Sequence, residues 1–378
     1  MSMLPNLILL LSFLFSSEPV FGDRQTLGVI ESDLINESSG IVASRKNDNV
    51  FWTHNDSGDL NRIYALNNFG EHLGIYYLDD YDARDWEDIA IGPGPSENEN
   101  YLYIGDIGDN DSEYDMKYIY RFIEPDVTSN QAPSSQVIYN IDSIEFQYDD
   151  GNRDAETLIL DPITKDIIIF SKREEAVHVY QLPFPQNIES SMVAEQISSI
   201  DFYLDDPLFD LGRIVAGDMS ADGTELLIKS FINIFHFPKY ENQNFSEILS
   251  NPITIVEYIV EPQGEAIGWH PEGYGYFTIS EESEDIPCHL YFYPRVVGCT
   301  DSFANNYNPY ALEEDDSCIY DYIIGDLNQD EIIDVLDIIL ILNIILDNAS
   351  PYNQQADCNN DGYIDVLDVV QLLNIILT

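Results

Sequence analysis

Short apolar runs, separated by turn-forming residues, fill the chain from Asp23 to about Pro294. The runs are rich in Ile, Tyr, Phe and Val, and stretches such as VFWTH and YLYIGD show the alternation of β-strands. Asp, Asn, Gly and Pro lie between the runs and favour turns. Long helical periodicity is absent from this part of the sequence. The pattern therefore predicts a mainly β domain over residues 23–295.

A loose repeat underlies these strands. Five small or acidic openings each precede a strand, a turn, a second strand and often a third; the openings lie at Ser39, Trp86, Ala155, Val215 and Glu265. Small sheets of this kind cannot bury both faces alone and pack radially, which predicts a β-propeller of five or six blades. The strand TLGVIE near Thr26 is a candidate to complete the last blade and close the ring. Residues 188–211 and 245–262 leave the blade number open, and a large β-sandwich is the alternative architecture.

The pattern changes near the end of the chain, where an Asp-rich loop followed by a strongly apolar helix occurs twice. The copies begin at Asp326 and Asp357, which are 357 − 326 = 31 residues apart, and read DLNQDEIIDVLD and DCNNDGYIDVLD. Calcium takes about six to eight oxygen ligands, and a twelve-residue loop supplies them from positions one, three, five, seven, nine and twelve. The predicted ligands, with position seven acting through its backbone carbonyl, are Asp326, Asn328, Asp330, Ile332, Asp334 and Asp337 in the first loop, and Asp357, Asn359, Asp361, Tyr363, Asp365 and Asp368 in the second.

Helix capping is the alternative explanation of these acids, because a helix begins at the ninth residue of each loop and its N-terminal end favours negative charge. Capping explains only two acids per copy, so we interpret both loops as calcium sites. Position twelve is Asp rather than the longer Glu of an ordinary EF-hand. Position six is Gly362 in the second loop but Glu331 in the first. Because the bend at this position suits Gly, we expect the first loop to bind calcium more weakly.

The duplicated loop, the Asp at position twelve and the helix that follows resemble dockerin repeats, over the last 54 residues or so, 325–378. The resemblance implies a domain over residues 322–378, with Ca²⁺ as its cofactor and a cohesin-like module as its partner. The family's contact positions are the tenth and eleventh residues of each loop and part of the following helix. They correspond here to Val335, Leu336, Leu342, Asn343, Val366, Leu367, Leu373 and Asn374. Many dockerins have hydroxyl or basic residues at these positions, whereas this set is largely apolar.

Both C-terminal helices are apolar around nearly their whole circumference, as IILILNIIL and VVQLLNIIL show. An antiparallel pair of such helices buries one face of each and leaves apolar surface outside. Surface of this kind usually marks a binding site for a partner. The alternative is that it packs on the preceding domain of the same chain.

Four cysteines are present: Cys288, Cys299, Cys318 and Cys358. They allow three complete pairings, and spacing alone does not select one. Cys299 and Cys318 bracket a turn-rich stretch, so we favour that disulfide and leave the other two cysteines either paired or free.

Residues 296–321 resemble a short calcium-associated repeat of secreted bacterial proteins, with GCTD at one end and DDSC at the other. A rigid spacer is the favoured role, although one more cation could be held by Asp301, Asn306, Asn308, Asp315 and Asp316.

Charge and the first residues indicate the compartment. The formal net charge is −54, from 69 acidic and 15 basic residues, which argues against binding nucleic acid or an anionic membrane surface. A generally acidic protein of a salty environment would have a similar balance of acidic and basic residues.

Residues 1–22 have the apolar core and small-residue end of a secretion signal, without its usual basic start. No other segment has the length and apolarity of a membrane span. We therefore expect a secreted or cell-surface protein in an oxidising, calcium-rich compartment.

The function of the propeller is less clearly indicated. Aligning the five units brings Glu87, Glu156 and Glu265 to matching places, and these are the candidate catalytic residues. The same alignment places Lys172, Arg173 and Lys229 at equivalent blade positions. One interpretation is a metal-activated water that attacks a phosphate ester beside these cations, in a propeller loosely similar to phytase-like and esterase-like ones.

Another interpretation is a pair of carboxylates that act as acid and base on a glycosidic bond. The dockerin resemblance favours it, because that family often tethers enzymes of polysaccharide breakdown. A non-catalytic ligand-binding or scaffolding module is equally compatible, since HNDSGD and GDIGDN are good turn sequences. Whether the propeller is an enzyme is left open; if it is, we expect a hydrolase. A Ser elbow, an HExxH helix, a phosphate loop and a Cys-His metal cluster are all absent from the sequence.

Overall fold

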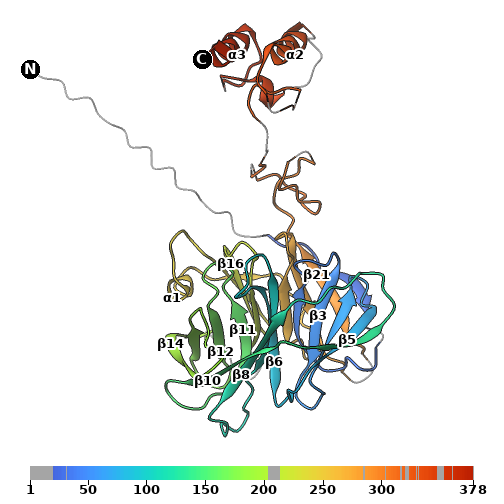
Figure 1. Cartoon of the computed structure of the whole chain (residues 1–378), viewed down its shortest axis with the longest axis vertical. Helices are drawn as coiled ribbons and strands as arrows, with labels where there is room; N and C mark the ends of the chain where they lie inside the picture. Colours follow the sequence, from blue (N-terminus) through green and yellow to red (C-terminus); the bar gives the residue numbers. More distant parts are fainter. Residues whose placement is uncertain are drawn as a thin grey trace, which may run out of the picture. The chain divides into compact units, whose positions relative to one another are not determined.

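The computed structural model describes residues 20–378 except 31, 203–212, 284–285, 303, 316, 320–322, 329, 331, 347–352, 360 and 378. Most of the predicted secretion signal, together with Asp316 and Glu331, therefore lies outside the described residues. The chain divides into two compact units, Met1–Val297 and Gly298–Thr378 (Figure 1). Each unit is described below by itself.

The described part of the first unit forms five blades. Blade 1 contains β2 (Ser38–Ala43), β3 (Val50–Asn55), β4 (Arg62–Asn67) and β5 (His72–Leu78). Blade 2 contains β6 (Trp86–Pro93), β7 (Asn100–Asp106), β8 (Lys117–Ile123) and β10 (Asp142–Tyr148). Blade 3 contains β11 (Ala155–Leu160), β12 (Ile167–Ser171), β13 (Val177–Leu182) and β14 (Met192–Ile200). Blade 4 contains β15 (Ile214–Met219), β16 (Glu225–Ser230), β17 (Ile234–Pro238) and β18 (Thr254–Val256). Blade 5 contains β19 (Ala266–Trp269), β20 (Gly275–Ile279), β21 (His289–Pro294) and β1 (Gln25–Val29).

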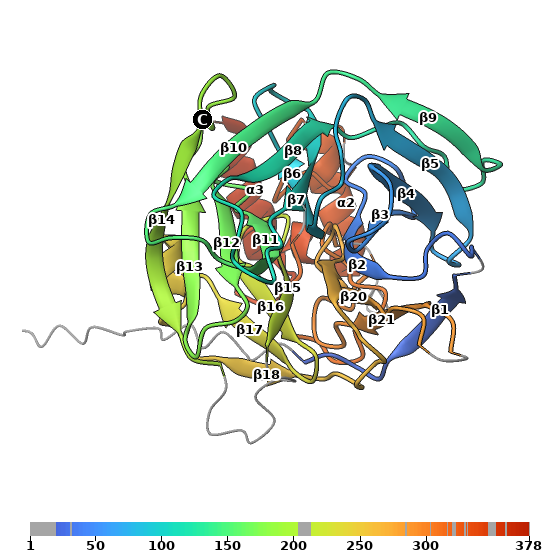
Figure 2. The same cartoon turned by 90° about the horizontal axis from the view of Figure 1, so that it is seen from below.

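The blades are arranged as a ring around their first strands. β2, β6, β11, β15 and β19 each contact the next in this order, and β19 contacts β2 again (Figure 2). β1 pairs antiparallel with β21, so the beginning of the unit completes the last blade and closes the ring. This is the closure predicted for the strand near Thr26. The predicted propeller is confirmed, and its described blades number five; a β-sandwich does not describe this ring.

The two stretches that left the blade number open supply outer elements of existing blades. Residues 188–211 contain β14, the outer strand of blade 3, and residues 245–262 contain α1 (Phe245–Ile248) and β18, the outer strand of blade 4. Two parallel pairings also connect neighbouring blades at their edges. β9 (Ser134–Ile138) pairs with β5, and β10 pairs with β14 (Figure 2).

Apolar side chains fill each interface between neighbouring blades. Trp52 and Tyr76 of blade 1 pack in one cluster with Trp86 and Ile104 of blade 2, and four further clusters join blades 2 and 3, 3 and 4, 4 and 5, and 5 and 1 among the described residues. Burial of apolar surface on both faces of each small sheet stabilises the ring. Phe21 belongs to the cluster of blades 4 and 5, so the packed part of this unit includes a residue assigned to the end of the predicted signal.

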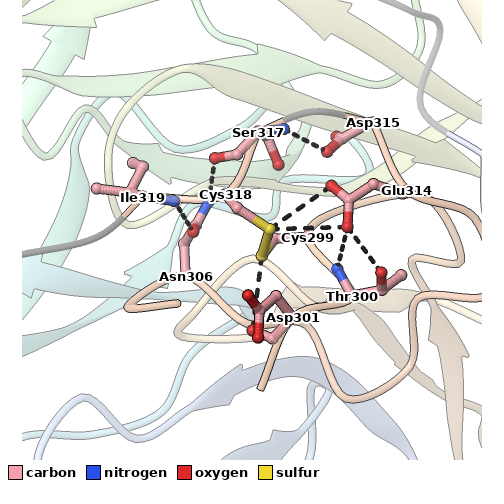
Figure 3. Close-up of a disulfide and its surroundings, with 9 residues drawn as sticks. All are labelled: Cys299, Thr300, Asp301, Asn306, Glu314, Asp315, Ser317, Cys318 and Ile319. Atoms are coloured by element: carbon pink, nitrogen blue, oxygen red, sulfur yellow. Dashed lines mark hydrogen bonds between the residues drawn. A yellow bond between two sulfur atoms is a disulfide. The ribbon is translucent and has the colours of Figure 1, made fainter. Parts of the chain in front are cut away.

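The second unit begins with a disulfide-bracketed segment and continues into two helices. Cys299 and Cys318 form the expected disulfide, with Cα atoms 4.7 Å apart, whereas Cys288 and Cys358 are free cysteines (Figure 3). Helices α2 (Val335–Leu346) and α3 (Val366–Leu377), with the short 3₁₀ helix η2 (Gln354–Ala356), follow. Their small core is formed by Ile338, Ile341, Ala356 and Leu372. None of the helices in the described ranges is long and apolar enough to cross a membrane.

Candidate functional site

β-Bulges place two of the three candidate glutamates, Glu87 and Glu156, at the beginning of their inner strands. In blades 1 to 4 the pairing of the first strand with the second shifts register at one residue: Ser39, Glu87, Glu156 and Val215. Glu265 stands directly before β19 in blade 5. A bulge redirects the side chain of the extra residue and often occurs next to functional sites. The structure thus brings Glu87, Glu156 and Glu265 to related positions in their blades.

Carboxylates gather around these glutamates. Three groups have one oxygen of each member within 4.8 Å of the others: Asp56, Asp85 and Glu87; Asp56, Glu265 and Glu281; and Glu87, Asp154 and Glu156. Asp56 and Glu87 each belong to two groups, so the acids form one continuous cluster at the mouth of the propeller. We call this set of seven residues the mouth cluster.

Basic side chains neutralise only one side of the mouth cluster. Lys172 forms an ion pair with Glu156, and Arg173 forms one with Asp154 at 2.5 Å. The Lys229 side chain instead donates to the backbone carbonyls of Gly264 and, at 3.0 Å, Ser230. The predicted equivalence of the two lysines is wrong: Lys172 follows the last residue of β12, whereas Lys229 precedes the last residue of β16.

Burial and crowding raise the pKa values of several mouth acids. The pKa of Glu87 is raised well above its usual value, first by burial and then by the charges of Asp56 and Asp85. Burial and the charges of Asp56 and Asp154 raise the pKa of Asp85 to about 6. Burial and the nearby Glu265 raise the pKa of Glu281 to about 8. The ionised forms of these acids are therefore unfavourable, and a bound cation would stabilise them.

The sequence also contains a signal for two mouth acids that were not predicted. Asp85 and Asp154 each lie two residues before a bulge glutamate, as D-W-E and D-A-E. The same spacing in two blades places an Asp at the start of each inner strand and its Glu at the bulge. This repeated Asp-x-Glu pattern identifies both acids without the structure.

The first predicted calcium loop in the second unit folds around its own side-chain oxygens. Asp326 Oδ1 accepts a hydrogen bond from the backbone N–H of Asp330 at 3.2 Å, and Asp330 Oδ1 accepts from Ile332 at 3.0 Å. From the far end of the loop, Asp337 Oδ1 accepts from Leu327 at 2.8 Å. These bonds hold the carboxylates on the inside of the loop.

The second loop repeats the arrangement at the corresponding positions. Asp357 Oδ1 accepts from Asp361 at 3.1 Å, Asp361 Oδ1 accepts from Tyr363 at 3.0 Å, and Asp368 Oδ1 accepts from Asn359 at 3.2 Å. Gly362 at position six has φ +84°, a left-handed conformation that favours glycine.

Helix capping is present in both copies but does not account for the whole arrangement. Asp334 Oδ1 accepts from the backbone N–H of Leu336 at 2.7 Å, and the Asp334 N–H donates to Asp337 Oδ2 at 2.9 Å. Asp365 and Asp368 make the same contacts at the start of α3. The other oxygen of Asp337 and of Asp368 remains directed at the loop.

The charge of the loops has no cationic side chain to balance it in this unit. Asp326, Asp337, Asp357 and Asp368 are buried, and the sequence of residues 298–378 contains no Lys, Arg or His. Burial of several carboxylates without a positive charge to balance them is strongly unfavourable. A hard cation such as Ca²⁺ prefers oxygen ligands of this kind, so the residues fit the predicted ion.

The C-terminal unit also matches a known family. Residues 324–377 match the family model of the dockerin type I domain. This segment is a dockerin type I domain. The resemblance seen in the sequence is therefore confirmed, and dockerin domains of this type bind Ca²⁺ and cohesin modules. No curated protein sequence matches the chain.

Solved structures with remote similarity were also found. A luciferin-regenerating enzyme is 9% identical with a TM-score of 0.38, covering 72% of this chain and 95% of that chain. The Neurospora crassa Pan2 WD40 domain is 10% identical with a TM-score of 0.37, covering 73% and 98%. Kuenenia stuttgartiensis hydrazine synthase is 11% identical with a TM-score of 0.35, covering 66% and 70%.

The disulfide segment that precedes the dockerin domain uses its polar groups locally. Asn306 accepts a hydrogen bond from the Ile319 N–H at 2.7 Å and donates to the Ser317 carbonyl at 2.8 Å (Figure 3). Asp315 accepts from the Ser317 N–H at 3.0 Å. Glu314 lies close to both cysteines, but sulfur atoms joined in a disulfide are not thiolate ligands for a metal. These bonds and the disulfide fix the shape of the segment.

Proposed function

We propose that this protein is secreted and that its dockerin domain docks, with Ca²⁺ bound, onto a cohesin module, thereby displaying the five-bladed propeller on a cohesin-bearing partner. One observation supports this above the others. All eight contact positions implied by the dockerin resemblance are exposed on the folded domain: Val335, Leu336, Leu342, Asn343, Val366, Leu367, Leu373 and Asn374.

The exposed contact positions lie on the side of each helix that faces away from the small core. In α2 the buried side chains are Asp337, Ile338 and Ile341, and in α3 they are Asp368 and Leu372. The calcium-loop acids and the core therefore occupy one side of each helix. The other side presents aliphatic surface, which a partner can bury with a gain in free energy.

The capping and loop bonds explain why docking would require calcium. Asp337 belongs both to the start of α2 and to the first loop, and Asp368 has the same two roles in α3. An ion that fixes each loop also fixes the start of the helix that carries the contact residues. Removal of the ion leaves crowded acids at that point and loosens the contact face.

Mutation of the face tests this proposal. The full-length protein is measured against a panel of immobilised cohesin modules in millimolar Ca²⁺. A variant with Leu336→Asp and Leu367→Asp places a charge in each face, and we expect its affinity to fall by at least about 100-fold. Leu60→Asp with Ile163→Asp makes the same chemical change at exposed positions of the propeller and should bind like wild type. Binding of the first variant at wild-type strength, or no binding of wild type to any cohesin, would contradict the proposal.

A hydrolase in the propeller is the second candidate function. It is favoured by the convergence of Glu87, Glu156 and Glu265 on one rim with Lys172 beside them. The substrate would be a phosphate ester attacked by a metal-activated water, or a glycoside cleaved by two carboxylates. Glu87→Gln and Glu156→Gln variants should then lose turnover on such substrates and keep the wild-type circular dichroism spectrum. A wild-type protein without turnover on either class leaves the propeller as a non-catalytic module.

A further inference from the structure

We propose that the propeller holds its own divalent cation, of the Ca²⁺ type, between Asp56, Asp85 and Glu87 of the mouth cluster. This site is separate from the two dockerin loops and does not depend on docking. Asp56 follows β3 in blade 1, whereas Asp85 directly precedes β6 of blade 2 and Glu87 is the second residue of that strand. One oxygen of each carboxylate lies within 4.8 Å of the others, a spacing that one bound ion can bridge.

Glu87 is a buried member of this group whose carboxylate has no hydrogen-bond or ion-pair partner among the described residues. Its side chain is buried, with a relative exposure of 4% for the residue. Its carboxylate accepts no hydrogen bond from, and forms no ion pair with, any residue in the described part of the chain. A buried carboxylate without donors is strongly unfavourable unless a positive charge meets it. Lys172 is near, but its ammonium group is paired with Glu156.

Two other acids of the mouth cluster, in contrast, form ion pairs with basic side chains. Asp154 is paired with Arg173 and accepts a hydrogen bond from the Asp109 N–H at 2.8 Å. Glu156 is paired with Lys172. Among the described residues, no basic side chain forms an ion pair with Asp56, Asp85 or Glu87, so the uncompensated charge is concentrated on that side of the cluster.

The backbone closes tightly over this side of the cluster. A Cβ atom at Gly108 would lie 2.1 Å from Glu87 Oε1 and 2.5 Å from Asp85 Oδ2, so a larger residue here would displace these two carboxylates. The Gly108 N–H donates to the Asp85 carbonyl at 3.2 Å. The Ser39 hydroxyl donates to the Glu87 carbonyl at 2.5 Å and holds the bulge of blade 2 against blade 1. Packing therefore places Asp85 and Glu87 together, while Asp56 Oδ1 accepts a hydrogen bond from the Ser57 N–H at 2.5 Å.

The donor set selects the class of ion. The group contains carboxylate oxygens only, without His or Cys, which favours a hard cation over zinc or copper. Asp56 also lies within the same distance of Glu265 and Glu281 in blade 5. These acids offer further oxygens, directly or through water, as the larger Ca²⁺ ion accepts more readily than Mg²⁺. The ion would then connect blades 5, 1 and 2 at their inner strands.

Calcium stoichiometry of the full-length protein tests the site. Equilibrium dialysis should give three bound Ca²⁺ per wild-type chain. A variant with Asp337→Asn and Asp368→Asn, which impairs both dockerin loops, should keep one. Glu87→Gln and, separately, Asp85→Asn should each lose one ion and keep two. Glu195→Gln, at an exposed position of β14, removes the same charge and should keep three.

Thermal unfolding gives a second readout that does not rely on the mouth variants. In the Asp337→Asn/Asp368→Asn variant, an excess of Ca²⁺ at about 100 times the dissociation constant should raise the propeller's Tm by roughly 5 °C or more. Two ions in wild type, none in that variant and no calcium effect on its Tm would overturn the inference and leave the docking proposal intact. A third ion that persists in both Glu87→Gln and Asp85→Asn would equally contradict this assignment.

Discussion

The Asp88 carboxylate accepts a hydrogen bond from the backbone N–H of Leu158, at 2.9 Å, across the boundary between blades 2 and 3. Its other oxygen accepts from Ile89 in its own strand at 2.8 Å. Asp218 does the same between blades 4 and 5, accepting from Met219 at 2.9 Å and from Trp269 at 2.8 Å. Both acids are buried. Acids in the centre of this propeller therefore have two distinct roles, and these two join neighbouring inner strands.

Replacement of Asp88 by Asn should destabilise the propeller without changing calcium binding. The amide keeps one acceptor oxygen but turns an N–H₂ group toward one of the two backbone donors, which leaves a buried N–H unsatisfied. We expect a loss of about 1–3 kcal/mol in the free energy of unfolding. Denaturant unfolding of the full-length protein measures it, and Asp82→Asn at an exposed position is the matched control. An unchanged unfolding midpoint would show that the inter-blade hydrogen bond is dispensable.

Gly362 should determine the affinity of the second dockerin loop. Its φ of +84° is unfavourable for a residue with a Cβ, although no atom lies within 4 Å of the position that a Cβ would occupy. Gly362→Ala therefore adds backbone strain of about 1–2 kcal/mol without a steric clash. Calcium titration calorimetry should show roughly a 5- to 30-fold weaker second site and an unchanged first site. Equal affinities in the variant and wild type would rule out a left-handed requirement at position six.

Asp59 should make the propeller less stable in acid. Burial alone would raise the pKa of Asp59, but hydrogen bonds from Arg62 and Tyr64, at 2.5 and 2.7 Å, outweigh burial and lower it. A carboxyl whose folded-state pKa is lower than its unfolded value stabilises the fold above the unfolded value of about 4. That contribution disappears as the pH falls through the folded-state value.

Comparison of two variants isolates this contribution. Asp59→Asn should show a smaller drop in stability than wild type between about pH 5 and pH 2, whereas Asp48→Asn at an exposed position should follow the wild-type curve. Unfolding midpoints measured across that pH range decide the point. Parallel curves for wild type and Asp59→Asn would mean that the network around Arg62 is not linked to acid stability.

The disulfide should stabilise only the segment that it brackets. Cys299 and Cys318 are 19 residues apart, and closing a loop of about this length restricts the unfolded state by roughly 3 kcal/mol. A Cys299→Ser/Cys318→Ser variant should be cleaved by proteases within residues 299–318 much faster than wild type, with the Tm of the propeller unchanged. Limited proteolysis with mass spectrometry locates the cuts. Resistance equal to wild type would show that the hydrogen bonds of Asn306 are sufficient.

The sequence predicted those features that depend on local pattern. The calcium loops repeat after 31 residues with oxygens at fixed positions, so the second unit could be recognised from residues 326–337 and 357–368 alone. Each blade has a short alternating strand pattern, and Thr26 lies in a strand that closes the ring as expected. Glu87, Glu156 and Glu265 could be aligned because each lies at the beginning of the first strand of its unit.

Other features depend on contacts between segments that are distant in sequence. The parallel pairings of β9 with β5 and of β10 with β14 involve outer strands, where the pattern does not indicate which neighbour is chosen. Lys172 and Lys229 were aligned as equivalents, because a bulge and a turn of different length hide a register difference. Asp85 and Asp154 were missed because an acid before a strand is common in turns, and the convergence of their oxygens with those of Glu87 depends on contacts between blades.

The calcium dependence of docking is the most direct test of the account. Full-length protein is passed over immobilised cohesin modules in millimolar Ca²⁺, then in a chelator, and then in Ca²⁺ again. We predict tight binding in calcium, release in chelator and full recovery when calcium returns, because the ions fix the starts of α2 and α3. Equal binding in calcium and in chelator, or no binding to any cohesin in calcium, would contradict the claim that this dockerin is a calcium-dependent docking domain.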